Sequence, residues 1–452
     1  MARRWIKAAA GRVLARVMPA VLAVSLCLPA SLSAQTILRD PDIEHALREL
    51  SRPMIIAAGL SPSRLQILVV HDDRLNAFVA DADHVFIHSG LLLKVQTARA
   101  LQAVIAHELA HIANGHLARR ALNYRAARNT AAMGMLLSAI AASAGAGDAA
   151  QGILLGASGT AQRVFLGHTR AEEASADQSA VRYMTRQGVD AQGMIDVLSI
   201  FRGQEVLAAS RQDPYMRTHP LSRDRMRAVQ GYVAAAAGRT QDRPDDAYWF
   251  ARARGKLEAF IRNPTSVLRR IDANDTSDIA MLKRAVALHR IPKPDQAVEA
   301  ITALVQRKPK DPFLAELQGQ ILLESRRFTQ AVAAYARAAQ LAPNNALILA
   351  GYGRALLAMD TGTANRNALK TLQRAYARDP FQPAMLRDLG LAYARRSNPG
   401  MASLSIAERY ALIGRLKDAA THATRAEGLL PRGSPGWNRA QDILHAAQAA
   451  EK

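Results

Sequence analysis

A repeated pattern in the second half of the chain constrains its fold more than any other feature. Pro309 and Pro343 are 34 residues apart, and Gly319, Ala331 and Tyr335 stand between them at the spacing of a helix pair. Small residues let the two helices of a unit approach closely, and the aromatic ring fills the gap to the next unit. Units in the same register precede and follow this one. Because one unit cannot bury its apolar face alone, we expect stacked units that form an α-solenoid. Alanine-rich helix pairs without solenoid curvature are the alternative.

Composition and local patterns predict the fold class of the remainder. Apolar residues make up 49% of the chain and aromatic residues only 5%, which favours helices packed through small side chains. Three segments are typical of short strands: residues 65–70, 76–79 and 85–87. The polar, proline-containing segment 238–247 marks a domain boundary. We therefore expect a mostly α protein, with an α+β domain over residues 35–240 and an α-solenoid over residues 245–452.

The first 34 residues have the pattern of a secretory signal peptide. They include five basic residues, and no acidic residue occurs before Asp40. An apolar run extends from about Val17 to Leu28, and small residues continue to Ala34. The only cysteine, Cys27, lies in this leader. The exported protein is therefore expected to hold no disulfide, so that core burial and bound metal must stabilise it.

Charge and one apolar segment bear on the partners. The formal net charge is +21, to which the leader contributes five positive charges, and this balance favours anionic partners such as lipid head groups or acidic proteins. Nucleic acid is not expected, because the chain is exported and lacks interleaved aromatic residues. Residues 129–166 are rich in Ala, Gly, Leu and Met, but their clean apolar part ends at Asp148 and is too short for a membrane span. We expect a helical hairpin there, with peripheral membrane contact as an open alternative.

One helical segment carries metal-binding chemistry. Residues 101–120 are LQAVIAHELAHIANGHLARR, an amphipathic pattern in which His107 and His111 lie four residues apart on one face. Two imidazoles so placed can bind one Zn²⁺, and Glu108 beside them can accept a proton from water. Histidines that only make polar contacts in a core are the alternative. His116 follows too early to belong to the extended three-histidine pattern, so we expect a hydrogen-bonded packing histidine there.

A further ligand must come from another segment. Residues 170–180 are RAEEASADQSA, which places Glu173 and Asp177 four residues apart on one helical face. Glu173 would complete a two-histidine, one-glutamate ligand set, and Asp177 would orient a ligand imidazole from behind. Glu172 points elsewhere on this helix and is expected to be solvated.

These motifs together resemble a known peptidase family. The HELAH sequence is followed by Arg170, Glu173, Ala176 and Asp177, then by Thr218-His219-Pro220 and Arg225, a set similar to the HtpX and CAAX-prenyl-protease family of gluzincin metallopeptidases. The second half resembles tetratricopeptide repeats. The resemblance implies one zinc ion per chain at His107, His111 and Glu173, with Glu108 as general base. It also implies that His219 lies near the metal, where it either restrains or assists catalysis.

The expected activity is hydrolysis of internal peptide bonds in the periplasm. The resemblance implies that the substrates are misfolded or stalled outer-membrane proteins, and that the repeats recruit them or an outer-membrane assembly machinery, with a chaperone-like role. The strand at residues 85–87 is expected to pair with an extended substrate. Asp81, Asp83 and His84 depart from the family pattern and indicate a different substrate preference. The alternative is a repeat-based periplasmic chaperone or scaffold with little proteolytic activity.

Overall fold

The computed structural model describes residues 37–119, 170–241 and 243–450, which belong to one compact unit. The predicted signal peptide, residues 1–34, and the apolar segment, residues 129–166, lie outside these described residues. Within the described ranges, no helix combines the length and the apolar character that crossing a membrane requires.

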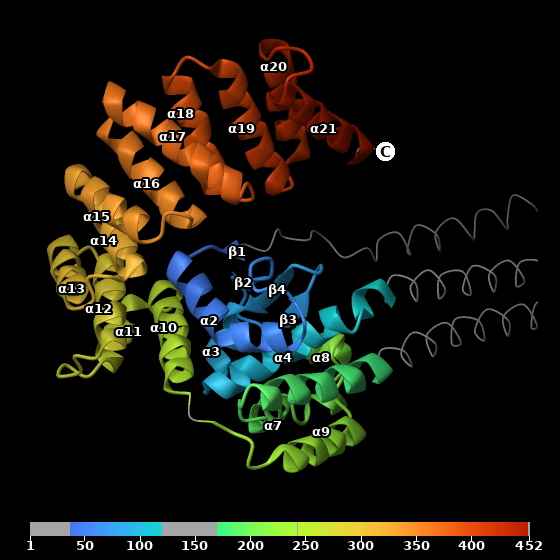
Figure 1. Ribbon diagram of the computed structural model, residues 1–452. Coiled ribbons are helices and arrows are strands. Elements are labelled where there is room, and N and C mark those ends of the chain that lie inside the picture. The colour runs from blue at the N-terminus through green and yellow to red at the C-terminus, as the bar shows by residue number, and fades with distance from the viewer. Residues whose placement is uncertain (1–36, 120–169, 242, 451–452) are drawn as a thin grey trace, which may run out of the picture. The chain divides into compact units, whose positions relative to one another are not determined.

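The first part of the chain combines helices with a small sheet (Figure 1). Its elements are, in order, β1 (Ile37–Leu38), α2 (Pro41–Ala57), β2 (Gln66–Val70), β3 (Ala77–Val79), β4 (His84–His88), α3 (Ser89–Lys94), α4 (Ala98–Ala113), a helix through residues 170–186, α7 (Gln192–Ile200), the short 3₁₀ turns η1 (Gln204–Val206) and η2 (Ala209–Arg211), α8 (Pro214–Thr218) and α9 (Arg223–Ala236). The three predicted strands are thereby confirmed as β2, β3 and β4.

The sheet has the strand order β1-β2-β4-β3. β4 pairs in parallel with β2 on one side and antiparallel with β3 on the other. The prediction that residues 85–87 pair with a substrate was therefore wrong, because both edges of β4 are already occupied. Strand order depends on contacts between distant segments, which the alternation of residues along one strand does not reveal. Within this sheet β3, rather than β4, lies at an edge.

Helix α4 runs through the core of this part, beside α2. Thr97 caps its N-terminus by accepting a hydrogen bond from the Ala100 amide. Residues Ala100 to His111 are all buried, so the helix is enclosed well beyond one face. Its C-terminus is followed by Gly115, whose φ of +70° suits glycine and turns the chain out of the helix. The next residues, 116–119, are again helical.

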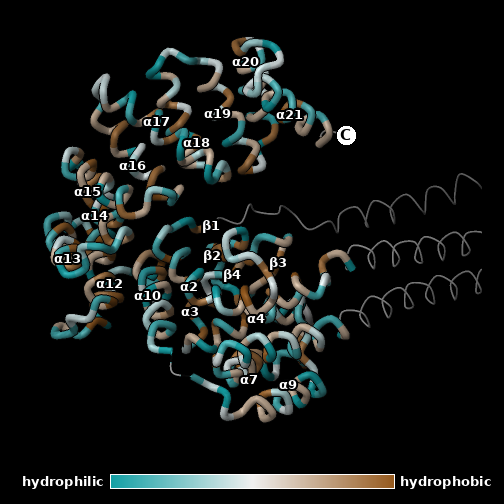
Figure 2. The backbone as a smooth tube through the Cα atoms, in the orientation of Figure 1, coloured by the Kyte–Doolittle hydropathy of each residue, from teal (hydrophilic) through white to brown (hydrophobic). Residues whose placement is uncertain are grey.

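The second part consists of helices that pack against their neighbours in sequence. They are α10 (Pro244–Ile261), α11 (Pro264–Arg270), α12 (Asp278–Arg290), α13 (Pro294–Arg307), α14 (Pro312–Glu324), α15 (Phe328–Leu341), α16 (Ala346–Met359), α17 (Gly362–Arg378), α18 (Pro383–Arg395), α19 (Pro399–Leu412), α20 (Leu416–Leu429) and α21 (Pro435–Ala450). Many begin with proline, whose fixed φ and missing amide hydrogen suit the first helical position. Hydrophilic and hydrophobic stretches alternate along them (Figure 2), as expected for amphipathic helices that bury one face.

Close packing around one tyrosine shows why the repeats need small residues. Tyr335 of α15 is buried, and its ring lies against Gly319 of α14 and Gly351 of α16. A Cβ added at Gly319 would lie 2.6 Å from a ring carbon, and one at Gly351 would overlap the ring as well. The predicted role of the aromatic residue between neighbouring units is therefore confirmed, as is the mostly α fold class.

Helix α10 packs with both parts of the chain. Phe250 and Leu257 belong to the same apolar core as α4, whereas Ala259 belongs to the core of the first repeat helices. The limits 35–240 and 245–452 remain a prediction. Whatever the exact limits, the helix that follows the proposed boundary is shared by two cores.

A buried ion network also joins α10 to its neighbours. Arg252 of α10 donates to Asp42 of α2 at 2.6 Å and to Asp311, the N-cap of α14, at 2.6 Å. Lys256 is fully buried, and its ammonium lies 2.9 Å from a carboxylate oxygen of Asp40. These contacts tie the beginning of the sheet-containing part to the repeats with charged hydrogen bonds that are shielded from water.

Candidate metal centre

Four buried side chains from three segments converge on one point. His107 and His111 come from α4, Glu173 from the helix 170–186, and His219 from the C-cap of α8. Each offers one potential ligand atom, and these atoms all lie within 4.8 Å of one another. The structure thus brings together all three predicted ligands and places His219 beside them.

The distances within this cluster suit a small cation at its centre. The Nε2 atoms of His107 and His111 are 3.1 Å apart, and they lie 3.2 and 3.3 Å from the two carboxylate oxygens of Glu173. Two imidazole nitrogens and one carboxylate are the donor set that Zn²⁺ takes in catalytic sites, with ligand bonds of about 2 Å. The chemistry of these donors therefore fits zinc.

His219 fills the remaining side of the cluster. Its Nδ1 lies 3.0 Å from Glu173 Oε1 and 3.3 Å from His107 Nε2. Its Nε2 lies 3.4 Å from Glu108 Oε1. The imidazole is thus positioned between the three predicted ligands and the predicted general base, where an attacking water would have to stand.

Glu108 is a fully buried carboxylate next to the cluster. Among the described residues, neither of its oxygens has a hydrogen-bond partner. An ionised carboxylate without such partners is costly to bury, so its position calls for a compensating positive charge. A cation held by the neighbouring ligands would supply that charge.

Asp177 and Arg225 support the cluster from behind. Asp177 Oδ1 lies 3.0 Å from His107 Nδ1, as the predicted orienting role requires. Arg225 donates to both oxygens of Asp177 at 2.5 and 2.9 Å, and its Nη1 lies 3.0 Å from Glu173. The same guanidinium donates to the main-chain carbonyl of His219. Sequence reasoning quoted Arg225 only as part of a motif, and its contacts emerge only in the fold.

The side chains of the cluster shift one another's pKa values in both directions, and His111, where burial is the largest cause, has its pKa lowered well below the usual value. Burial opposes ionisation of Glu173, but the neighbouring histidines outweigh burial and lower the pKa of Glu173 well below its usual range. Burial likewise opposes ionisation of Asp177, yet Arg225 lowers its pKa. Burial disfavours protonation of His107, but hydrogen bonds to Asp177 and Glu173 raise its pKa to about 9. The ionised carboxylates of Glu173 and Asp177 thus give the cluster negative charge that a metal cation could balance.

Of two further predictions beside the site, the one for His116 is confirmed and the one for Glu172 is wrong. His116 was expected to be a packing histidine, and it is indeed buried and hydrogen-bonded, but its partner is the ring of His111. Glu172 was expected to be solvated, and this was wrong, because only 4% of the residue is exposed. The buried face of its helix is wide enough to enclose the residue next to Glu173, whereas spacing alone indicated a narrow face.

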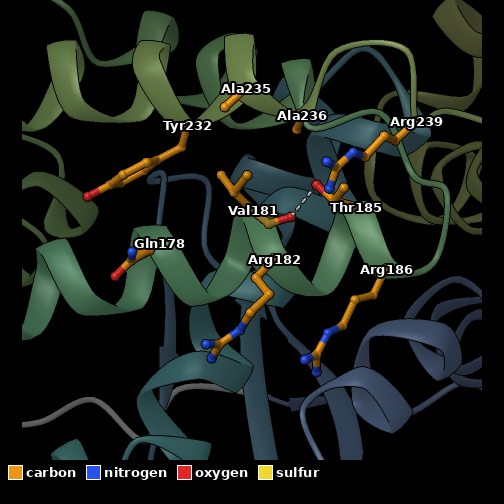
Figure 3. Close-up of a pocket in the computed structure, with 9 residues that line it drawn as sticks. All are labelled: Gln178, Val181, Arg182, Thr185, Arg186, Tyr232, Ala235, Ala236 and Arg239. Carbon is orange, nitrogen blue, oxygen red and sulfur yellow. Dashed lines mark hydrogen bonds between the residues drawn. The ribbon is translucent and has the colours of Figure 1, made fainter.

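A surface pocket near the same helix is distinct from this cluster. It has a volume of about 390 Å³ and lies between the helix 170–186 and α9 (Figure 3). Val181 and Thr185 lie between the two helices, Arg182 and Arg186 extend side by side, and Arg239 approaches from the end of α9. None of the four clustered ligand candidates lines it, so it is not the site of the predicted chemistry.

Comparison with known proteins agrees with this geometry. Residues 39–233 match the model of Peptidase family M48, a range that includes all the site residues discussed above. Residues 39–233 are therefore similar to an M48 peptidase domain and are called the M48 domain below. The zinc-ligand candidates of this M48 domain come from helices that sequence spacing had singled out, and the domain's match ends before the repeats begin.

Relatives that resemble the chain carry protease names. A "Putative beta-barrel assembly-enhancing protease" of Vibrio cholerae is 30% identical over 254 residues, which are 50% of this chain and 51% of the relative. The chain thus spans about half the length of that relative. The "Beta-barrel assembly-enhancing protease" of Escherichia coli K12 is 24% identical over 408 residues, covering 88% of this chain and 81% of the relative. The latter similarity extends beyond the M48 domain into the repeats.

Part of the chain is also similar to solved structures. One of MamA ("MamA MSR-1 C2") is 16% identical and covers 37% of this chain and 96% of its own, with a TM-score of 0.31. A tetratricopeptide-repeat protein of Thermus thermophilus is 18% identical and covers 37% of this chain and 100% of its own, with a TM-score of 0.26.

Proposed function

We propose that this protein is a periplasmic zinc metalloendopeptidase that hydrolyses misfolded or stalled outer-membrane proteins. The observation that carries the proposal is the convergence of His107, His111 and Glu173 around one point, with the buried carboxylate of Glu108 beside it. The M48 match and the protease names of the relatives support the peptidase activity. The leader-like N-terminus supports export, and the relatives' names support the substrate class.

The residues of the site divide the chemistry among them. Zinc held by the three ligands would supply positive charge that polarises the scissile carbonyl and makes a neighbouring water more acidic. Glu108 would accept the proton of the attacking water and deliver it to the leaving amine nitrogen. Asp177 would hold the His107 imidazole in place by accepting a hydrogen bond from His107 Nδ1. Arg225 would fix the carboxylates of Asp177 and Glu173.

His219 is proposed to keep the resting site closed. Its ring occupies the side of the cluster next to Glu108, and only 3% of the residue is exposed. Four protein side chains around a metal are typical of structural sites, whereas catalytic sites keep a position open for water. Displacement of His219 would therefore open the site for catalysis.

The sheet edge gives a place for the substrate main chain. Asn76 and His88 form a hydrogen-bonded pair between the two strands, because the His88 amide donates to the Asn76 carbonyl at 2.9 Å. By the alternation of an antiparallel pair, the main-chain groups of Ala77 and Val79 then point away from β4. Ala77 is fully buried and Val79 is partly exposed, so an extended substrate could add to β3 at Val79, with little demand on its sequence.

The second candidate function is a repeat-based periplasmic chaperone or scaffold with little proteolysis. The closed, fully buried state of the cluster favours this alternative, since a site blocked by His219 has no room for substrate. Strong binding of unfolded clients together with negligible turnover would support it.

Metal content measured beside proteolysis tests the proposal. Purified full-length wild type should hold one zinc per chain and cleave casein or a misfolded porin. Glu108→Gln should keep zinc and lose about 10²–10⁴-fold in rate, because it removes only the general base. Glu173→Ala should lose both zinc and activity. Retention of stoichiometric zinc by Glu173→Ala at chelator levels that strip His107→Ala would show that the carboxylate ligand is misassigned.

A further inference from the structure

The turn at the end of α4 brings one more histidine back to the predicted metal ligands. Gly115, at a φ of +70°, ends the first helical run, and His116 begins the next. Although His116 follows His111 by only five residues, the change of direction lets its ring fold back against that ligand. Only 1% of His116 is exposed, so the contact is shielded from water.

The contact involves specific ring nitrogens. His116 Nδ1 lies 3.0 Å from His111 Nδ1, with the ring centroids 4.9 Å apart and the planes inclined by 73°. The other nitrogen of His111, Nε2, faces His107 and Glu173. A nitrogen that binds a metal must offer its lone pair, so a neutral His111 ligand carries its proton on Nδ1. That proton is then donated to Nδ1 of His116, which in turn carries its own proton on Nε2.

Each of the two predicted ligand histidines thus has a hydrogen-bonding partner at its Nδ1, but the two partners differ in chemistry. His107 has the carboxylate of Asp177 at 3.0 Å from its Nδ1. His111 has the imidazole of His116 at the same distance from its Nδ1. A neutral acceptor fixes the ring and its tautomer without adding another negative charge to a cluster that already contains Glu173 and Asp177. Partners of this kind commonly change metal affinity by 10–100-fold when removed.

We propose that His116 is a positioning residue that holds the His111 imidazole in the tautomer and orientation needed for metal binding. The inference rests on the proposed metal site and extends it to a residue outside the ligand set. His116 touches neither substrate nor reacting atoms, and its effect passes entirely through His111. A residue that only filled space at this position would be replaceable by an apolar side chain of similar size.

A matched pair of substitutions separates positioning from packing. His116→Asn keeps an oxygen near the position of Nδ1 that can accept the His111 proton, whereas His116→Leu has nearly the same shape and no acceptor. Zinc affinity would be measured by chelator competition on the full-length protein, together with the visible absorption spectrum of the Co²⁺-substituted form. Circular dichroism of the metal-depleted proteins reports whether each variant is folded.

We expect His116→Leu to lose about 10–100-fold in zinc affinity and to alter the Co²⁺ spectrum, and His116→Asn to retain most of the affinity. Equal losses in both variants, or wild-type affinity in His116→Leu, would overturn the inference while leaving the metal site intact. Absence of zinc binding in the wild type would instead refute the proposed function, and this inference with it. If His116→Leu is unfolded, His116→Gln, whose amide reaches the Nε2 position instead, serves as the variant without an acceptor at Nδ1.

Discussion

The predicted metal cluster and the ion network around α10 both bury charged side chains, but they balance those charges in different ways. In the network, Arg252 and Lys256 supply cations to the carboxylates of Asp40, Asp42 and Asp311. In the cluster, four groups with lone pairs face one another within 4.8 Å. In the network each of these carboxylates already has a cationic side chain as its partner, whereas the cluster would need a cation from outside the protein. The difference distinguishes charges that hold a fold together from charges arranged to bind.

The largest expected effect is a loss of stability when the ion network around α10 is broken. Arg252→Ala would leave the buried carboxylate of Asp42 and the partly buried one of Asp311 without their guanidinium. Removing one partner from a buried ion pair typically costs about 3–5 kcal/mol. Urea denaturation should show a lower midpoint of unfolding by a corresponding amount.

An exposed pair provides the control for this substitution. Arg227 and Asp224 lie 3.2 Å apart, with side chains 75% and 90% exposed, so Arg227→Ala should change the midpoint little. Similar midpoints for the Arg252 and Arg227 variants would mean that the buried network contributes no more than a surface pair, and the contrast with the cluster would lose its basis.

An intermediate effect is expected at the predicted metal cluster, where a substitution of His219 should change the peptidase rate. If His219 blocks the position of the attacking water, His219→Ala should raise peptidase activity several-fold without changing zinc occupancy. If its imidazole instead stabilises the oxyanion of the reaction, removing it should cost about 10²–10³-fold in rate. Assays on a full-length client and on a short unstructured peptide measure both.

The two readings of His219 predict opposite signs, so the outcome is decisive. Faster cleavage of both substrates supports restraint, and a large loss on both assigns a catalytic role. Unchanged rates on both would leave His219 as a structural residue and would contradict the closed resting state that its position suggests.

The smallest expected effect is a pH dependence in the network. Burial, together with the carboxylates of Asp40 and Asp42, raises the pKa of Glu316 to about 8, although Lys256 acts in the opposite direction. A carboxyl whose pKa is raised on folding binds more protons in the folded state, so its contribution to stability falls as the pH rises from about 5 to 8. Glu316→Gln should remove this contribution, and the stability of the variant relative to the wild type should rise by about 2 kcal/mol between pH 6 and pH 8.

Parallel denaturation series at several pH values check this prediction. Asp278→Asn is a useful control, since Asp278 pairs with Lys308 at the surface of the neighbouring repeat. A difference between Glu316→Gln and wild type that stays constant from pH 6 to pH 8 would show that Glu316 does not retain a proton in the folded protein.

Much of the site could be predicted from sequence because its geometry is local. His107 and His111 lie four residues apart on one helix, and so do Glu173 and Asp177, so the helical period alone places each pair on one face. That the two pairs meet at one site was predicted from the ligand set of catalytic zinc, which combines two histidines with a carboxylate. Helix α4, the three strands and the small residues of the repeats were likewise predicted from patterns that extend over only a few residues.

The missed features depend on contacts between distant segments or on the exact end of a helix. Arg225 reaches Asp177 and Glu173 across 48 and 52 positions of sequence, a distance over which spacing carries no information. β4 looked like any short strand, and its central place follows only from its two neighbours. His116 could have been found from the Asn-Gly pair before it, since this pair signals the end of a helix and a new direction for the next side chain.

Lys256 is fully buried, so its chemical reactivity reports when α10 separates from its neighbours. An amine-reactive reagent can modify exposed lysines at once, but it reaches Lys256 only when α10 separates from the start of α2. The rate at which mass spectrometry detects labelling at this one residue therefore measures how often these helices part, under native conditions and without any added probe. A bound protein that separates the repeats from the M48 domain would increase the labelling rate of Lys256, even where no peptide bond is cut.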